Sequence, residues 1–249
     1  MGNREHIVLS DQQIQFFQME GYLALDAITT PTEIQRLQRS YDLLLSLHTG
    51  CASSYQGELS QIDEALKHKG RILLTNPQRY HQAFGQTLFE DNALHIARQL
   101  VGDEVKLRES YILYKPAHFG TVTPWHQEEA YLPPECTYNL LSFWLALQDT
   151  REENGGMHFL PGSHKFEVLP HYRWESGDDN TVLAVNPELF DVARAVSCPL
   201  PAGGATIHTS RTLHYAGPNL SDTPRRAFIL DIEYPRPPLV KRNANGGEQ

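Results

Sequence analysis

The chain has 249 residues, 40% of them hydrophobic and 20% charged, and a formal net charge of −9 at pH 7. This composition is typical of a folded globular protein and excludes a disordered chain. The acidic balance argues against a nucleic-acid-binding protein, which usually presents a basic face.

The N-terminus has no signal pattern, and no apolar run approaches the roughly 18–20 residues of a membrane span. Three separated cysteines without a CxxC pair indicate reduced thiols rather than a disulfide framework or a zinc knuckle. We therefore expect a cytoplasmic protein without membrane partners.

Residues 1–104 are predicted to be mostly helical. Ser10-Asp11 before residues 12–19 and Gly21 after them predict a capped helix, followed by a strand at 22–25. Thr30-Pro31 predicts the start of a second helix that runs to about residue 48. Weaker patterns predict a helix at 60–68 and a strand at 71–74, and apolar spacing predicts a third helix from 91 to 101.

Residues 105–235 carry short β-rich runs separated by Pro and Gly, at 110–115, 140–147, 157–160, 205–208 and 227–234. Helices followed by many short strands predict a mainly β fold, a sandwich or barrel with packed helices. We find no linker and no repeat, so 1–249 is predicted to be a single domain. Residues 165–196 show little periodicity and suggest an irregular insertion that acts as a lid, and 236–249 suggest a frayed tail.

His126 and Glu128 are the starting point for a metal site. In an extended strand alternate side chains leave the same face, so both would point at one spot. Two His and one carboxylate with open positions suit non-haem Fe(II) oxygenases. Glu129 is the fallback carboxylate if the register is shifted by one.

His214 is the best candidate for the third ligand, because it follows a probable strand and precedes a Gly-Pro-Asn turn. His208 competes for this role from six residues upstream. His-x-Glu alone is a weak pattern that also fits a hydrogen-bonded pair.

Arg225 and Arg226 would face opposite sides of a strand, so that one of them can point inward. An inward Arg beside a metal requires an anion, and its planar fork fits a carboxylate. A dicarboxylate that chelates the metal at one end and meets this Arg at the other is 2-oxoglutarate.

These motifs together resemble the phytanoyl-CoA dioxygenase family of Fe(II)/2-oxoglutarate oxygenases. The matching stretches span about residues 110–234: Trp125–Glu128, Trp144–Leu147, Glu153–Met157, Leu160–His164, His214–Asn219 and Arg225–Ala227. The resemblance implies a double-stranded β-helix, the jelly-roll core that cupins also have. It implies iron ligands at His126, Glu128 and His214, and a 2-oxoglutarate site at Arg225 with Trp144 and Tyr111 beside it.

The family usually has Asp where this chain has Glu128. A carboxylate is nevertheless present, which argues against a halogenase, because related halogenases carry a small residue there. The expected activity is O2-dependent hydroxylation, or another oxidation, of a small metabolite or natural-product intermediate, with release of succinate and CO2. Tyr131, Arg173 and Trp174 are the expected substrate contacts.

Two other classes keep part of this pattern. A cupin-like protein that binds metal and ligand without oxidation would need the triad but not Arg225 or Trp144. A zinc hydrolase is disfavoured, because the sequence has no HExxH motif and no evident general base.

Overall fold

The computed structural model describes residues 6–48, 70–133, 139–175 and 182–235. The helix predicted at 60–68 and the tail predicted at 236–249 lie outside these residues. Within them, no helix is both long enough and apolar enough to cross a lipid bilayer.

The N-terminal helices begin and end at the predicted capping residues. Helix α1 (Asp11–Glu20) starts at a capping box of Ser10 and Gln13 and ends at Gly21, whose φ is +80°. Helix α2 (Pro31–His48) has the predicted bounds. Helix α4 (Leu88–Val101) begins three residues earlier than predicted, because the Thr87 hydroxyl caps it by accepting from the Glu90 amide.

Two antiparallel sheets form the body of the protein. The larger has the order β1-β10-β5-β12-β3-β2 and the smaller β4-β11-β6-β9, while β7 and β8 pair separately. The larger sheet comprises β1 (Tyr22–Leu25), β2 (Ile72–Thr75), β3 (Lys106–Lys115), β5 (Leu140–Ala146), β10 (Ala205–Thr209) and β12 (Arg225–Glu233). The others are β4 (Thr123–His126), β6 (Met157–Phe159), β7 (His171–Trp174), β8 (Val182–Val185), β9 (Val196–Cys198) and β11 (His214–Ala216).

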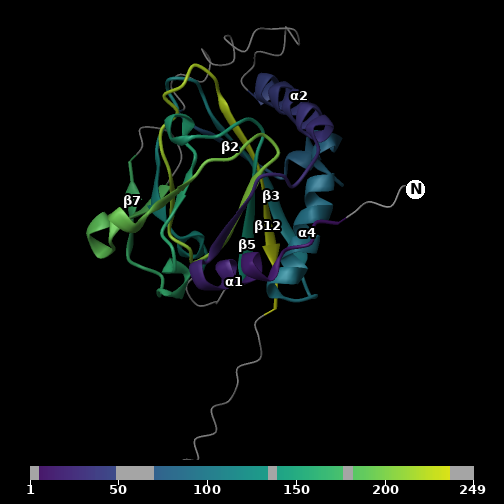
Figure 1. The fold of residues 1–249 in the computed structure, drawn as a ribbon. Coiled ribbons are helices and arrows are strands. Elements are labelled where there is room, and N and C mark those ends of the chain that lie inside the picture. The colour runs from purple at the N-terminus through teal and green to yellow at the C-terminus, as the bar shows by residue number, and fades with distance from the viewer. Residues whose placement is uncertain (1–5, 49–69, 134–138, 176–181, 236–249) are drawn as a thin grey trace, which may run out of the picture.

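The two faces of the larger sheet have different partners. One face packs against α1, α2 and α4 through a large apolar cluster that includes Phe143 and Phe228, and α2 and α4 lie along this side in Figure 1. The other face packs against the smaller sheet, with Trp144 and Ile229 beside Phe159. Because side chains alternate along a strand, successive residues of β5 and β12 pack in turn against the helices and against the smaller sheet. The predicted jelly-roll arrangement with packed helices is confirmed.

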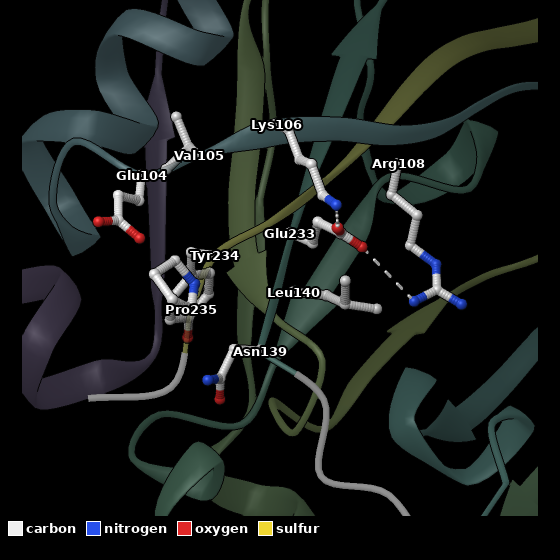
Figure 2. A pocket seen from close by; sticks show the side chains of 9 residues that line it. All are labelled: Glu104, Val105, Lys106, Arg108, Asn139, Leu140, Glu233, Tyr234 and Pro235. Atoms are coloured by element: carbon white, nitrogen blue, oxygen red, sulfur yellow. Dashed lines mark ion pairs between the residues drawn. The ribbon is translucent and has the colours of Figure 1, made fainter. Parts of the chain in front are cut away.

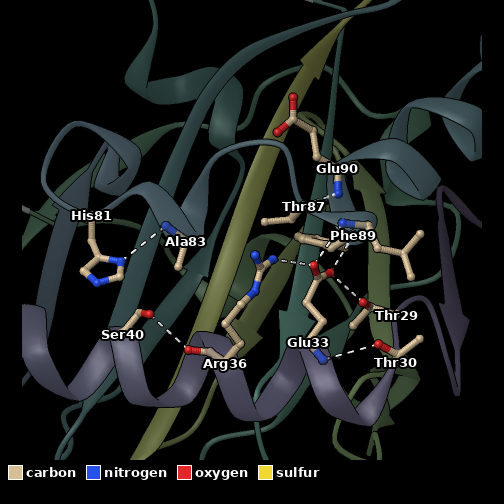
Figure 3. Close-up of polar contacts among 11 residues, drawn as sticks. Thr29, Thr30, Glu33, Arg36, Ser40, His81, Ala83, Thr87, Phe89 and Glu90 are labelled. Atoms are coloured by element: carbon tan, nitrogen blue, oxygen red, sulfur yellow. Dashed lines mark hydrogen bonds and ion pairs between the residues drawn. The ribbon is translucent and has the colours of Figure 1, made fainter.

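A buried carboxylate joins α2 to α4 (Figure 3). Glu33 accepts hydrogen bonds from the backbone amides of Leu88 and Phe89, at 3.0 and 2.9 Å, and from the Thr29 hydroxyl at 2.6 Å. It also forms an ion pair with Arg36. An acidic group at the first amides of a helix is favourable for the helix dipole, so Glu33 holds the start of α4 against α2.

Residues 165–196 are more regular than predicted. Strands β7 and β8 form an antiparallel pair within this segment, and Val185 packs with Trp125, Leu160 and Leu213 in a third apolar cluster. The runs were too short to show strand periodicity in the sequence. In Figure 1 β7 lies on the side of the molecule away from α2 and α4.

Candidate metal and co-substrate site

Three potential metal ligands meet at one edge of the smaller sheet. His126 is the last residue of β4 and His214 the first of β11, and the antiparallel register places them opposite each other. Glu128 begins the short 3-10 turn Glu128–Tyr131 rather than continuing the strand. Gln127 between them is still extended (φ −119°, ψ 131°), so the predicted alternation holds for this one step.

The ligand atoms are close enough to share one ion. Glu128 Oε1 lies 3.2 Å from His126 Nε2 and 3.4 Å from His214 Nε2. All three ligand atoms lie within 4.8 Å of one another, and no other such group of His, Cys, Asp and Glu occurs among the described residues. Both histidines are buried, while the Glu128 side chain is 30% exposed.

The tautomers of both histidines are set by backbone carbonyls. His126 Nδ1 lies 2.8 Å from Pro124 O, and His214 Nδ1 lies 2.9 Å from Thr212 O. A carbonyl can only accept, so each Nδ1 carries a proton, and each Nε2 faces Glu128 either as a hydrogen-bond donor, when the ring is charged, or with a lone pair free for a metal, when the ring is neutral. When both rings are neutral, these three converging electron-pair donors repel one another unless a cation, either a proton or a metal ion, lies between them.

The charge state of Glu128 suits this role. Burial alone would raise the pKa of its carboxyl, but hydrogen bonding to His126 and His214 outweighs burial and holds that pKa well below its ordinary value. Glu128 therefore remains ionised and available as an oxygen ligand.

Gln127 fixes the two ligands that flank it. Its side chain is fully buried and points away from the cavity, where Nε2 donates to Arg211 O at 2.8 Å and Oε1 accepts from Leu169 N at 2.8 Å. Its backbone amide donates to His171 Nε2 at 3.0 Å. The residue between the ligands is thus bonded both to the segment before β11 and to the segment around β7.

The alternatives considered for the triad lie elsewhere. Glu129 forms a two-point ion pair with Arg211, at 2.8 and 3.0 Å, and is not in the metal-binding group. His208 is also outside that group, although its ring lies only 4.4 Å from that of His214. Both of its ring nitrogens are buried without a hydrogen-bond partner among the described residues.

Arg225 points into the space between the sheets, and Arg226 points to the helices. Arg225 is fully buried, and its three guanidinium nitrogens have no hydrogen-bond partner in the described part of the chain. Its guanidinium carbon lies 5.1 Å from the centre of the Trp144 ring. Burial lowers the pKa of Arg225 to about 10. Arg226 instead forms an ion pair with Asp42 at 2.7 Å.

Lys115 is a second buried cation that the sequence did not single out as a site residue. It lies opposite Arg225 in the β3–β12 register and donates to the carbonyls of Ala216 and Gly217, at 3.0 and 2.6 Å. Burial, together with the charge of Arg225, places its pKa well below the ordinary value. Lys115 lies four residues after Tyr111 on β3, so strand alternation places both side chains on the same face. This spacing is the sequence signal that could have identified Lys115.

One cavity connects these groups. It is lined by Arg225, Trp144, Tyr111, His208 and the triad, together with Thr123, Ser142 and apolar side chains. The Trp144 indole nitrogen and the Thr123 hydroxyl are also buried without partners among the described residues. A cavity with metal ligands at one end and unpaired donors along its walls fits an anionic, oxygen-rich molecule, because each buried unpaired polar group costs about 1–3 kcal/mol. The residues present therefore fit a divalent metal with 2-oxoglutarate.

A second cavity of about 370 Å³ opens beside the first and shares Tyr111, Thr123, His126 and Glu128 with it. Its other charged lining residues are Arg71, Arg108, Glu109 and Asp231. Burial, and then the charge of Glu128, raise the pKa of Asp231 to about 7.

A hollow of about 570 Å³ lies further along β3 (Figure 2). It shares Arg108 and Leu140 with the second cavity, and it contains the ion pair of Lys106 with Glu233 at 2.5 Å. None of the three potential metal ligands lines it.

The three residues expected to contact substrate are separated in the structure. Tyr131 lines the second cavity, and its ring lies 5.9 Å from that of His126. Its hydroxyl accepts from the Leu183 amide at 2.9 Å. Arg173 and Trp174 are exposed on β7 and do not line the cavities beside the triad.

The jelly roll, the His-Glu-His cluster and the cavity of unpaired donors define a non-haem iron oxygenase that uses 2-oxoglutarate. Residues 17–227 match the model of the phytanoyl-CoA dioxygenase (PhyH) family. The chain belongs to this family and is a 2-oxoglutarate-dependent non-haem iron dioxygenase. The resemblance seen in the sequence is confirmed, and the non-oxidative and zinc-hydrolase alternatives are set aside.

Individual relatives agree with this class. The chain is 28% identical to a probable alpha-ketoglutarate-dependent hypophosphite dioxygenase of Stutzerimonas stutzeri, over 90% of this chain and 77% of the relative. It is 26% identical to ectoine dioxygenase of Streptomyces coelicolor, over 89% and 77%. Among solved structures it is similar to EvdO2 of Micromonospora carbonacea var. aurantiaca complexed with 2-oxoglutarate, with a TM-score of 0.77, 27% identity and 93% coverage of both chains.

Proposed function

We propose that His126, Glu128 and His214 hold Fe(II), and that Arg225 binds the far carboxylate of 2-oxoglutarate, with Trp144 and Tyr111 beside it. The observation that supports this most is the fully buried guanidinium of Arg225 without a partner among the described residues. A buried charge of this kind is costly unless it meets an anion. The three converging ligand atoms in the same cavity support the metal in the same way.

The reaction we propose is hydroxylation, or a related oxidation, of a small organic metabolite or natural-product intermediate. When bound, iron and 2-oxoglutarate supply the oxidising chemistry, in which O2 is consumed and succinate and CO2 are released. The protein residues orient the co-substrate and exclude water, which is the usual division of work in cofactor enzymes.

The cavity of about 370 Å³ is the proposed substrate site, because it borders His126 and Glu128 directly. Its size is within the range of small-molecule sites. Guanidinium groups of Arg71 and Arg108 and carboxyl groups of Glu109 and Asp231 line it. This mixture of charges favours a polar molecule over a long acyl chain. Of the three residues expected to contact substrate, Tyr131 lines this cavity, and we propose that it contacts the bound substrate.

Glu128 supports oxygen transfer rather than halogenation. With Glu128 as a ligand, its carboxylate would fill the position that is left free for chloride where a small residue stands in its place. We expect no halogenated product in the presence of chloride, and a Glu128→Ala variant should lose hydroxylation.

Anaerobic addition of Fe(II) and 2-oxoglutarate, followed by air, tests the proposal. We expect a visible charge-transfer band before air, and succinate after it. A panel of small polar metabolites should then include compounds that increase succinate formation and gain one oxygen atom by mass spectrometry. A protein that gives neither the band nor succinate with any of them would contradict the proposal.

A further inference from the structure

His208 is a buried polar side chain that the triad does not use. It is 2% exposed, and neither ring nitrogen has a hydrogen-bond partner among the described residues. Its ring packs at 4.4 Å from that of His214 and at 5.2 Å from that of Phe159. An imidazole carries at least one N–H in every protonation state. Burying that donor unpaired costs about 1–3 kcal/mol, so a bound molecule is the natural partner.

The strand register places His208 at the iron end of the co-substrate cavity. His208 pairs with Ser142 across β10 and β5, and Trp144 pairs with Ile229 of β12. Arg225 precedes Ile229 by four residues, so it enters the cavity from the opposite end of these strands. Arg225 and His208 therefore enter the same cavity from opposite sides of Trp144, as the two ends of a dicarboxylate require.

His208 faces the co-substrate and not the proposed substrate. It lines the cavity that contains Arg225 and Trp144, and it is not among the residues that line the second cavity with Arg71 and Tyr131. Its nitrogens also lie outside the group of potential metal ligands. The remaining acceptor at this end is the carboxylate of 2-oxoglutarate nearest the metal.

We propose that His208 is a further co-substrate-binding residue, which donates a hydrogen bond to the C1 carboxylate of 2-oxoglutarate. This inference rests on the orientation of 2-oxoglutarate proposed above, with its far carboxylate at Arg225. Such a hydrogen bond holds the metal-binding end of the molecule in one rotation, while Arg225 holds the other end.

Anaerobic titration of the Fe(II)-loaded full-length protein tests the proposal. The charge-transfer band reports 2-oxoglutarate binding directly, without turnover. His208→Phe keeps an aromatic ring and removes the N–H, whereas His208→Gln keeps an N–H donor. We expect His208→Phe to raise the Kd for 2-oxoglutarate on the order of tenfold, as the loss of a single hydrogen bond to a charged group predicts, and to shift the band. His208→Gln should stay within about threefold of the wild type.

Succinate provides the second arm, because it keeps the far carboxylate but lacks the C1 carboxylate. Its Kd, measured by competition with 2-oxoglutarate, should differ by less than about twofold between His208→Phe and wild type. His158→Phe is the matched control, since His158 is a partly buried histidine on β6 that lines neither cavity. It should leave both constants unchanged.

The outcomes separate this inference from the proposed function. An unchanged 2-oxoglutarate Kd in His208→Phe would overturn the inference, and so would an equal loss of succinate binding. If His208→Phe does not fold, as judged by its melting temperature, His208→Leu replaces it as the variant without an N–H donor and is compared with His208→Gln, which keeps one. A wild-type protein that shows no band at all would instead contradict the 2-oxoglutarate site itself.

Discussion

Replacing Arg225 by Met should stabilise the empty protein and weaken co-substrate binding at the same time. Burial lowers the pKa of Arg225 from 12.5 to about 10, so its charged form is disfavoured by about 3 kcal/mol at 1.36 kcal/mol per pKa unit. This cost is present at every pH below 10, where the group is charged in both the folded and the unfolded state. Met fills much of the same space against Trp144 without a charge.

Both effects of the Arg225→Met substitution are large enough to measure. Removing a cost of about 3 kcal/mol should raise the melting temperature of the metal-free protein by up to about 6–12 °C for a chain of this size. Losing two charge-assisted hydrogen bonds, each about 1.5–3 kcal/mol, should weaken 2-oxoglutarate binding at least about 100-fold. Ligand-induced stabilisation should fall accordingly.

Scanning calorimetry with and without 2-oxoglutarate measures both effects. Arg226→Met is the matched control, because the neighbouring arginine faces the helices and pairs with Asp42. It should lower the melting temperature and leave the 2-oxoglutarate Kd unchanged. An Arg225→Met protein that is less stable when empty and binds 2-oxoglutarate normally would show that Arg225 neither destabilises the empty protein nor binds the co-substrate.

Three further predictions concern the metal site and the scaffold. His126→Ala and His214→Ala should each abolish turnover and reduce bound iron after reconstitution, measured by metal analysis of the folded protein. The raised pKa of Asp231, about 7 against 3.8, means that the fold favours the protonated carboxyl, so stability present at low pH is lost as pH rises through 7. About 2 kcal/mol of that loss falls between pH 5.5 and 7, at 1.36 kcal/mol per pH unit. Asp231→Asn should remove this part in the metal-free protein, measured by urea unfolding at pH 5.5 and 8.5; parallel pH profiles would contradict the assignment. Glu33→Gln should lower the free energy of unfolding by about 1–3 kcal/mol, because a neutral amide accepts more weakly from the amides of α4; an unchanged urea midpoint would contradict its role.

The parts of the fold that rest on local signals could be predicted from the sequence. Ser10 and Gly21 bound α1 through capping interactions that involve only neighbouring residues. The start of α4 was placed too late, since apolar spacing pointed to residue 91 while the Thr87 cap set the actual start. Strands β4 and β11 are only four and three residues long, too short to show a period, although they carry both histidine ligands.

The site residues divide in the same way. The pair His126 and Glu128 could be found because their spacing is local. Strand alternation alone could not distinguish Arg225 from Arg226. The family resemblance pointed to Arg225, and in the structure Arg226 instead pairs with Asp42 on the helical side. His208 could not be assigned from the sequence, since its importance depends on a cavity formed by strands distant in the chain.

The hydrogen bonds of Gln127 have a consequence for how tightly the site takes up its metal. The rotational freedom of a free chain at Gln127 is already lost on folding, because its side chain is bonded at both ends and its amide is bonded to His171. When the metal binds, the backbone between His126 and Glu128 is therefore already ordered. The conformational entropy lost in positioning these two ligands is a cost of folding and not of metal binding. Part of the affinity for iron is thus contributed by residues that never approach the ion.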